Sequence, residues 1–465
     1  MKSFRMPTAY TILLSLLLVM TILTWVIPAG RYQTGAEGEP VSGTYEQIPQ
    51  QGQPITSVFT APLEGLYEAI DIAAFILMVG GFLGVVGKTG AIDRGISALV
   101  AKLRGKETLL IPILMLVFAL GGTTFGMAEE TIAFYPLVLP IFISAGYDPI
   151  TAVAVILVGA GVGTLASTVN PFATGIAAGF AGVSLGTGML LRVIMLVVML
   201  AASIYFVMRY AARVKAHPET SLMASRRADY TARFAAQGSD GAKLTWVQSL
   251  ALALFALTFL VMIYAVIPFG DMGLPLPTLG WWFPELSALF LVGGVVIGLI
   301  DRMSEEELTE TYVAGCADLL GVAFIIGISR GITVLMRDGA ITDTVLHWGE
   351  AALSGAGAVS FTLLVFVLYL PLTILIPSSS GLATLSIPIV APLGKFAGVG
   401  GDLVVTAFQS ASGLVNILTP TAAVVMGALA LGHVPYDRWV KYVWKLMLWF
   451  LLLALVFLVA GVLLG

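Results

Sequence analysis

Apolar runs of about 20 residues recur along the whole of this 465-residue chain. A helix of that length crosses the hydrocarbon core of a bilayer, so the pattern is typical of a polytopic α-helical membrane protein. The composition agrees, because 58% of the residues are hydrophobic and only 11% are charged. We therefore expect an all-α fold in the membrane. We interpret its first apolar run, residues 8–28, as a retained span.

Several function classes find no support in the sequence. A single cysteine, Cys316, excludes an internal disulfide and any multi-cysteine metal site. The three histidines lie far apart, and no motif of a metallopeptidase or of a nucleotide-driven pump is present. The basic residues fall in loops, so we expect no nucleic-acid partner. We also expect no enzyme activity and no cofactor, apart from Na⁺ or H⁺ as a coupling ion.

Two apolar stretches are interrupted in the middle. Residues 108–145 are broken at 121–130, and residues 358–397 are broken at 377–381. Each half is too short to span a bilayer alone. We predict that both stretches form re-entrant hairpins, and their tips must then be buried in protein to satisfy the exposed backbone.

Two further stretches read as discontinuous helices. Residues 148–181 are interrupted at Asn170 and the proline after it, and residues 402–431 are interrupted near Asn416. Proline removes a backbone hydrogen bond, and an asparagine side chain supplies a donor and an acceptor at such a break. We therefore count both asparagines among the candidate substrate-binding residues.

The two halves of the chain repeat one pattern. Pro136 and Pro140 in the first interrupted stretch match Pro388 and Pro392 in the second, both at the same offset (388 − 136 = 392 − 140 = 252). The order span, hairpin, broken helix, span also recurs. We predict a first repeat over 1–210, a linker over 211–245 and a second repeat over 246–465.

Charge predicts the orientation of these repeats. The linker is rich in lysine and arginine, which places it in the cytoplasm by the positive-inside rule, together with the N-terminus. The basic segment 88–106 has helical apolar spacing and reads as an interfacial helix, and the acidic segment 301–314 reads as a cytoplasmic loop. The hairpins then enter from opposite sides. The result is an inverted repeat of about nine transmembrane helices with the C-terminus outside.

Two adjacent carboxylates, Glu129 and Glu130, lie in the first break. An acid at bilayer depth costs roughly 2.5–3.5 kcal/mol on insertion scales and marks a functional site by default. The second break carries three hydroxyls instead, on Ser378, Ser379 and Ser380. Paired broken elements in inverted halves point to the binding site of a transporter near the midplane.

Arg330 and several hydroxyls complete the candidate set. Arg330 lies within an apolar span, where it either neutralises a glutamate or binds a carboxylate of the substrate. Oxygen ligands near the breaks are the candidate Na⁺ or H⁺ sites: Thr123, Thr124, Glu129, Thr174, Thr419 and Thr421. An acidic tip opposite a hydroxyl-rich tip suits a zwitterionic or cationic amino acid. A dicarboxylate would meet two glutamates and be repelled unless they were protonated or paired.

The chain resembles a known family in its first hairpin and its opening. The stretch GMAEETIAFYP at 126–136, the GYD at 146–148 and the RMPTAY at 5–10 resemble the DcuC-like carrier family, in particular its YfcC branch. The resemblance implies membership of the ion transporter superfamily, an elevator-type motion and a bacterial inner membrane. The family name implies four-carbon dicarboxylates, whereas the branch is provisionally labelled as basic amino acid antiporters. Superfamily members elsewhere carry Ser-Asn-Thr at both tips, and this chain does not.

We therefore expect a secondary active transporter of amino-acid-like solutes. Exchange or cation-coupled transport of a basic amino acid of the arginine or ornithine type is the first hypothesis, with an elevator mechanism. A carrier of C4-dicarboxylates or other carboxylates is the alternative, and a channel is a remote one. The expected partners are the small-molecule substrate, the lipid bilayer and a second copy of the chain in a homodimer.

Overall fold

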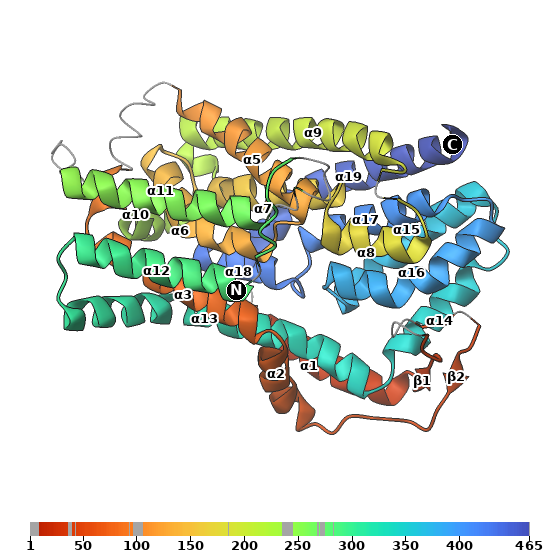
Figure 1. Ribbon diagram of the computed structural model, residues 1–465. Helices are drawn as coiled ribbons and strands as arrows, with labels where there is room; N and C mark the ends of the chain where they lie inside the picture. The colour runs from red at the N-terminus through yellow and green to blue at the C-terminus, as the bar shows by residue number, and fades with distance from the viewer. Residues whose placement is uncertain are drawn as a thin grey trace, which may run out of the picture.

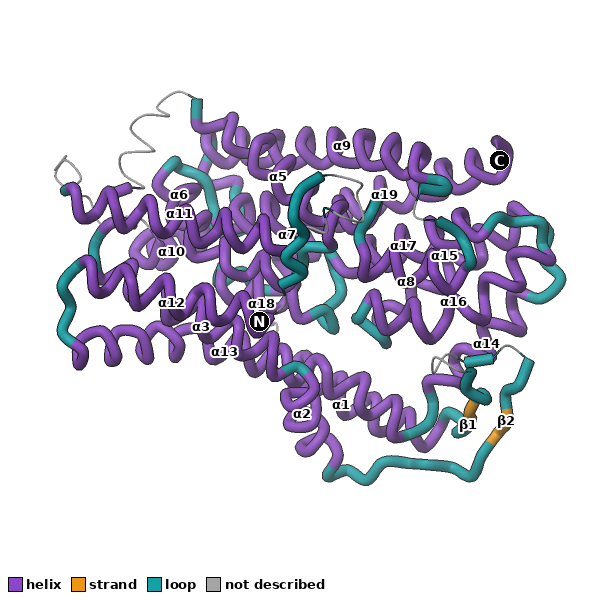
Figure 2. The backbone as a smooth tube through the Cα atoms, viewed as in Figure 1, coloured by secondary structure: helices purple, strands orange, loops and turns teal. Residues whose placement is uncertain are grey.

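The fold is built from helices that lie roughly parallel in a single bundle (Figure 1). A computed structural model describes residues 9–35, 40–41, 43–92, 94–95, 106–184, 186–234, 245–266, 269, 275–281 and 283–464. Figure 2 shows one small two-stranded pairing at the edge of the bundle, where β1 (Gly30–Arg31) runs antiparallel to β2 (Glu46–Gln47).

The helices follow the apolar runs of the sequence. Seven helices in the described ranges are long and apolar enough to cross a membrane, which confirms the expected all-α polytopic membrane class. In chain order the α-helices are α1 (Ala9–Val26), α2 (Ser57–Glu68), α3 (Ile70–Lys88), α5 (Leu110–Phe125), α6 (Tyr135–Ser144), α7 (Pro149–Leu165), α8 (Ile176–Ala181), α9 (Met189–Ala216), α10 (Arg227–Phe234), α11 (Trp246–Val266), α12 (Phe283–Ile300), α13 (Glu305–Asp338), α14 (Thr342–Leu353), α15 (Ala358–Leu375), α16 (Ser379–Phe396), α17 (Gly401–Asn416), α18 (Ala423–Leu431) and α19 (Tyr436–Leu464).

One group of helices is joined through glycine. Helix α13 packs along α2 and α3, and α12 packs on the other side of α3. A Cβ built on Gly80 would lie 2.4 Å from the Gly315 carbonyl oxygen, and one built on Gly65 would lie 2.3 Å from the Gly327 carbonyl oxygen. Such distances leave no room for a side chain, so the backbones of α13, α3 and α2 touch directly.

Helix α13 corrects one expectation from the sequence. We predicted a loop over 301–314, but the helix already begins at Glu305. The Ser304 side chain accepts a hydrogen bond from the Glu307 backbone N–H at 3.1 Å and so caps the helix. The glutamates of the first turn stabilise a helix N-terminus by their charge. The acidic residues of the predicted loop therefore start a helix.

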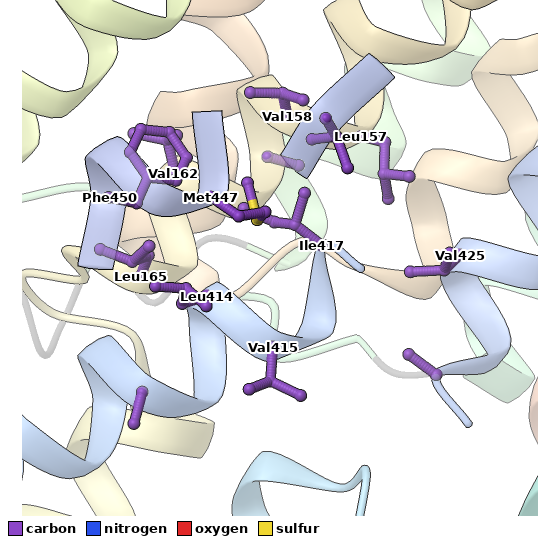
Figure 3. Close-up of a cluster of buried hydrophobic side chains, with 14 of the residues drawn as sticks. Leu157, Val158, Val162, Leu165, Leu414, Val415, Ile417, Val425, Met447 and Phe450 are labelled. Atoms are coloured by element: carbon purple, nitrogen blue, oxygen red, sulfur yellow. The ribbon is translucent and has the colours of Figure 1, made fainter. Parts of the chain in front are cut away.

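A second group of helices contains the interrupted stretches. Helix α7 packs on α5, α17 packs on α15, and α7 crosses α17. The side chains buried at this crossing form the cluster shown in Figure 3, with α19 covering it: Leu157, Val158, Val162, Leu165, Leu414, Val415, Ile417, Val425, Met447 and Phe450. A Cβ on Gly413 would lie 2.3 Å from the Leu165 Cα, so the two helices are in backbone contact there.

The interruptions fall where the sequence has its breaks, but the first half of each stretch is longer than we predicted. Residues 107–124 and helix α15 are each long and apolar enough to cross a membrane. Helix α5 ends at Phe125, a short 3₁₀ helix covers Glu129–Phe134, and α6 follows. Helices α15 and α16 are separated by residues 376–378. The first broken helix consists of α7, a π-helical turn over Pro171–Gly175, and α8. The second consists of α17 and α18.

Two predicted segments lie largely or partly outside the described residues. In the interfacial helix expected over 88–106, residues 93 and 96–105 lie outside the described ranges. In the linker, residues 235–244 lie outside them. The described part of the linker is not a plain loop, because α9 continues past its expected start to Ala216 and α10 follows.

The segment that carries β1 and β2 is held on α14 by polar contacts. The Tyr32 N–H donates to Asp343 Oδ2 at 2.9 Å, and the Tyr32 hydroxyl donates to Glu350 Oε2 at 2.8 Å. The Tyr45 and His347 rings stack with centroids 4.1 Å apart. These contacts lie beyond the ends of the spans, since α14 is a separate amphipathic helix between α13 and α15.

We predict that Asp343→Asn raises the melting temperature at pH 7 by about 1–2 °C. Burial raises the pKa of the Asp343 carboxyl, against the opposing effects of the Tyr32 N–H and Arg31. The protonated Asp343 carboxyl therefore stabilises the folded state. This contribution is full below the pKa of about 3.9 that the carboxyl has in the unfolded chain, and it is lost as the pH rises through its pKa in the folded protein. Asparagine keeps an acceptor for Tyr32 without the charge. Melting curves of both proteins from pH 4 to pH 7 test this; a constant difference between them would contradict it.

Candidate substrate site

The turn between α5 and α6 is shaped by one glycine. Gly126 ends α5 with φ of 77°, in the left-handed region that favours glycine. A Cβ on Gly126 would also lie 2.5 Å from the Asn170 Nδ2. The carbonyl of Thr123 accepts hydrogen bonds from the N–H groups of Thr168 and Val169, both at 3.2 Å. The turn after α5 is thereby fixed against the break between α7 and α8.

A cavity of about 260 Å³ lies where the two groups of helices meet. The group of α3, α12 and α13 contributes one wall, and the interrupted helices contribute the rest. The residues of the first wall are Ala69, Ile72, Phe283, Ile326, Ser329 and Arg330. Eight sequence-predicted residues line it together: Glu129, Glu130, Asn170, Arg330, Ser378, Ser379, Ser380 and Asn416. The volume is below the roughly 300–1,000 Å³ of sites for drug-sized ligands, so it suits a small solute.

The two glutamates differ in their contacts. Glu130 is 6% exposed, and its Oε2 accepts a hydrogen bond from the Ala128 N–H at 3.0 Å. Glu129 is less buried, and among the described residues its carboxylate has no side-chain partner. Glu130 therefore helps to hold the turn, whereas Glu129 is available to a ligand in the cavity.

Arg330 faces the same cavity from α13. Within the described part of the chain, it forms no ion pair or hydrogen bond with either glutamate. It nevertheless acts electrostatically on Glu129, as does Asp71 near the start of α3. The charged groups in the cavity wall are two carboxylates and one guanidinium, which leaves one formal negative charge.

The serines lie at the start of α16, opposite the acidic turn. Ser378 is the N-cap, and its hydroxyl accepts from the Gly381 N–H at 3.2 Å. The first N–H groups of a helix have no partner within the helix, and the helix dipole makes this end positive. The α16 terminus is therefore suited to an anionic group such as a carboxylate.

The two asparagines occupy matching places in the broken helices. Asn170 is 2% exposed, and its Oδ1 accepts from the Ala173 N–H at 3.2 Å. Asn416 ends α17, and its Nδ2 lies 3.5 Å from the Ser412 hydroxyl. The Asn416 Oδ1 is buried and has no hydrogen-bond partner among the residues that the structure describes. A buried acceptor without a hydrogen bond costs free energy. It therefore favours a bound solute that donates a hydrogen bond to it.

The threonines proposed as cation ligands do not line this cavity. Thr124 donates to the Leu120 carbonyl within its own helix at 2.6 Å, and Thr123 donates to the Ala166 carbonyl at 3.2 Å. Thr419 and Thr421 share a hydroxyl contact of 2.8 Å. Thr174 lies 2.8 Å from the Ser167 hydroxyl and donates to Gln409. The structure thus separates the five into local hydrogen-bonded sets around the breaks.

Gln409 lies outside the set of site residues that we predicted from the sequence. It lines the cavity, accepts from Thr174, and donates to the Ser167 carbonyl at 3.0 Å, so it joins α17 to the break after α7. A signal was present, because positions 409, 412, 413 and 416 are polar or small at helical spacing. Asp71, which also lies outside the predicted set, is close enough to act electrostatically on the Glu129 carboxylate.

We predict that Gly126→Ala lowers transport by about tenfold while Gly182→Ala does not. Both glycines have positive φ, 77° and 67°, so alanine adds a similar backbone strain of about 1–2 kcal/mol at each. Only the Cβ at position 126 meets another group, the Asn170 amide. Initial uptake rates in proteoliposomes, normalised to inserted protein, separate the two. Equal losses would show that strain alone matters.

Comparison with known proteins gives a family match over nearly the whole chain. Residues 6–463 match the sequence profile of the family described as the C4-dicarboxylate anaerobic carrier, DcuC. The chain belongs to this family. As a DcuC-family member of the YfcC type it is a multi-pass membrane transporter, which confirms the resemblance seen in the hairpin sequence.

Two relatives are similar over nearly the whole chain. A Haemophilus influenzae protein of uncharacterized function is 32% identical over 99% of this chain and 98% of its own length. The Escherichia coli K12 protein provisionally named basic amino acid antiporter YfcC is 30% identical over 95% of this DcuC-family chain and 93% of its own.

Two solved structures also resemble it, each at 16% sequence identity. Neisseria gonorrhoeae MtrF, described as illuminating a class of antimetabolite efflux pumps, has a TM-score of 0.43 and covers 98% of this chain and 95% of its own. The Alcanivorax borkumensis YdaH transporter has a TM-score of 0.40 and covers 98% of both chains.

Proposed function

We propose that this protein is a secondary active transporter of a basic amino acid of the arginine or ornithine type, working by exchange or by coupling to Na⁺ or H⁺. The observation that carries the proposal is the charge of the cavity wall, where two carboxylates face one guanidinium. A solute with one carboxylate and two cationic groups balances that wall. The name of the E. coli relative supports the same class.

The polar groups suggest how such a solute is held. Its α-carboxylate meets the N-terminus of α16, with Ser378 and its neighbours as donors. Its cationic groups meet Glu129 and the unpartnered Oδ1 of Asn416. Each end of the solute then replaces the water it loses with a group of opposite charge or dipole.

A carrier of C4-dicarboxylates remains the second candidate. Arg330 lines the cavity without an ion pair among the described residues, and the family description names this substrate class. Both carboxylates of such a solute would need cationic partners. The wall offers Arg330 and a helix N-terminus, but Glu129 and Glu130 oppose the second charge.

An elevator motion fits the position of the cavity. Its wall comes from two groups of helices, one joined by glycine contacts and one containing the interrupted elements. Movement of the second group along the first would expose the solute on alternate sides. We place the protein in the bacterial inner membrane as a homodimer, with the N-terminus cytoplasmic and the C-terminus periplasmic.

Counterflow in proteoliposomes tests this function. Vesicles loaded with unlabelled arginine should accumulate labelled arginine and ornithine, whereas vesicles loaded with succinate should not accumulate labelled succinate. Labelled aspartate serves as an amino acid with the opposite side-chain charge. Imposed Na⁺ and pH gradients identify the coupling ion. Succinate counterflow without arginine exchange would overturn the proposal in favour of the dicarboxylate carrier, and conductance without counterflow would indicate a channel.

A further inference from the structure

A second cavity, of about 740 Å³, lies between α9 and α19. None of its lining residues is shared with the cavity that contains Glu129. The two helices pack against each other, and Figure 1 shows them side by side along one edge of the bundle. Aromatic rings form its base, because the Tyr442 ring lies 4.7 Å from Tyr210 and 5.3 Å from Phe206 between centroids.

The walls of this cavity carry two matched stripes. On α9 the stripe is Tyr205, Arg209 and Arg213, and on α19 it is Lys441, Lys445 and Trp449. Successive members are four residues apart, so each stripe follows one face of its helix. All six side chains are exposed.

Both stripes have the same order of basic and aromatic residues from the linker end of the helices inward. Helix α9 runs toward the linker, and α19 starts beside it, since Phe234 of α10 contacts His433 just before α19. The basic residues of both stripes therefore lie at the linker end, and Tyr205 and Trp449 lie deeper. Beyond them are exposed aliphatic side chains on both helices: Val197, Val198, Leu452 and Val456.

The basic groups of this cavity form no ion pair with the part of the chain that the structure describes. The cavity is lined by four cations, two on each helix, and no carboxylate is among its lining residues. Within the described ranges none of the four forms an ion pair; Arg209 donates to the Tyr205 hydroxyl at 3.1 Å, and Lys445 lies over the Trp444 ring. The nearby Asp437 is paired with Arg438. Such a concentration of positive charge at a membrane boundary favours an anionic ligand.

We propose that this cavity binds the headgroup of an anionic glycerophospholipid. The order basic, aromatic, aliphatic from the linker end inward matches phosphate, glycerol–ester region and acyl chain. A soluble anion would use the basic groups but would leave Tyr205, Trp449 and the aliphatic side chains beyond them without a role. The site is independent of the transported solute, since it lies on the outer face of the helix group that contains the hairpins.

Quenching of tryptophan fluorescence by brominated lipid tests the site in the intact protein. Wild-type protein is placed in phosphatidylcholine vesicles that contain a minor fraction of brominated phosphatidylglycerol, and its quenching is compared with that of Trp449→Phe. The difference isolates the signal of Trp449. We expect strong quenching of that signal by brominated phosphatidylglycerol and weak quenching by brominated phosphatidylcholine at the same fraction. Equal quenching by both lipids would overturn the proposal.

A double variant tests the role of charge. Arg213→Gln with Lys445→Gln should weaken the preference for phosphatidylglycerol by about 30-fold (about 2 kcal/mol for two basic side chains). The matched control is Arg226→Gln with Arg227→Gln, which removes the same charge from an exposed part of the linker and should leave the preference unchanged. An equal loss in the control would reduce the effect to net charge. Displacement of the lipid by inorganic phosphate at constant ionic strength would assign the cavity to a soluble anion instead.

Discussion

Glu129→Gln is expected to lower arginine counterflow by about 30-fold or more. Its carboxylate lines the cavity and has no side-chain partner among the described residues, so its charge is available to the solute. Removing one member of a buried charge pair typically costs 2–5 kcal/mol, because the other charge remains without its partner. The loss should appear mainly as weaker binding of cationic solutes. Exchange in proteoliposomes at several arginine concentrations measures it.

Two other glutamates supply the controls for this result. Glu130→Gln keeps an acceptor for the Ala128 N–H and should impair transport less, because the turn is preserved and only charge is lost. Glu64→Gln changes an exposed acid on α2 that does not line the cavity and should have no effect. Full activity of both Glu129→Gln and Glu130→Gln would reduce the acidic pair to a structural turn.

Gly413→Ala is expected to lower the yield of folded protein and its melting temperature strongly. The added Cβ would lie 2.3 Å from the Leu165 Cα and 2.6 Å from its nitrogen, so it meets backbone atoms that cannot rotate away. Overpacking of a core typically costs 1–3 kcal/mol and occasionally more. Here the change also separates α17 from α7, the crossing that the cavity is built on. Thermal unfolding in detergent, followed by size-exclusion chromatography, provides the measurement.

Gly179→Ala is the matched control for this substitution. Gly179 lies within α8, and a Cβ there meets no atom within 4 Å. Alanine is also the better helix former, so this variant should match or exceed the stability of the wild type. If both variants melt at the same temperature, the close crossing of α7 and α17 does not govern the stability of the fold.

Local signals explain why much of this architecture could be predicted from the sequence. Gly126 and Pro377 interrupt apolar stretches by their own backbone preferences, and the acids and serines beside them are conspicuous in such surroundings. The start of α13 was also encoded locally. Ser304 followed by Glu307 is a capping pattern, and our prediction of a loop over 301–314 did not take it into account.

The rest of the cavity wall depends on packing between distant segments. Ala69, Ile72 and Phe283 line it, yet each is an ordinary residue of an apolar helix, and nothing in their spacing distinguishes them. The same holds for Asp71, whose proximity to Glu129 follows from how α3 meets the first hairpin. Sequence patterns describe the faces of one helix, whereas the choice of neighbour is made by the whole fold.

The glycine contacts of α13 have a consequence for how solute specificity can change. Where Gly80 meets Gly315 and Gly65 meets Gly327, the contact has no side chain that could adjust. We therefore expect these helices to behave as one rigid unit. Ala69, Ile72 and Arg330 have fixed positions in this rigid unit, and they form the wall of the cavity on one side of the solute. Variation among related carriers should then be concentrated in the opposite, adaptable half. There the turns that carry the glutamates and the serines can change without altering the packing of α2, α3 and α13.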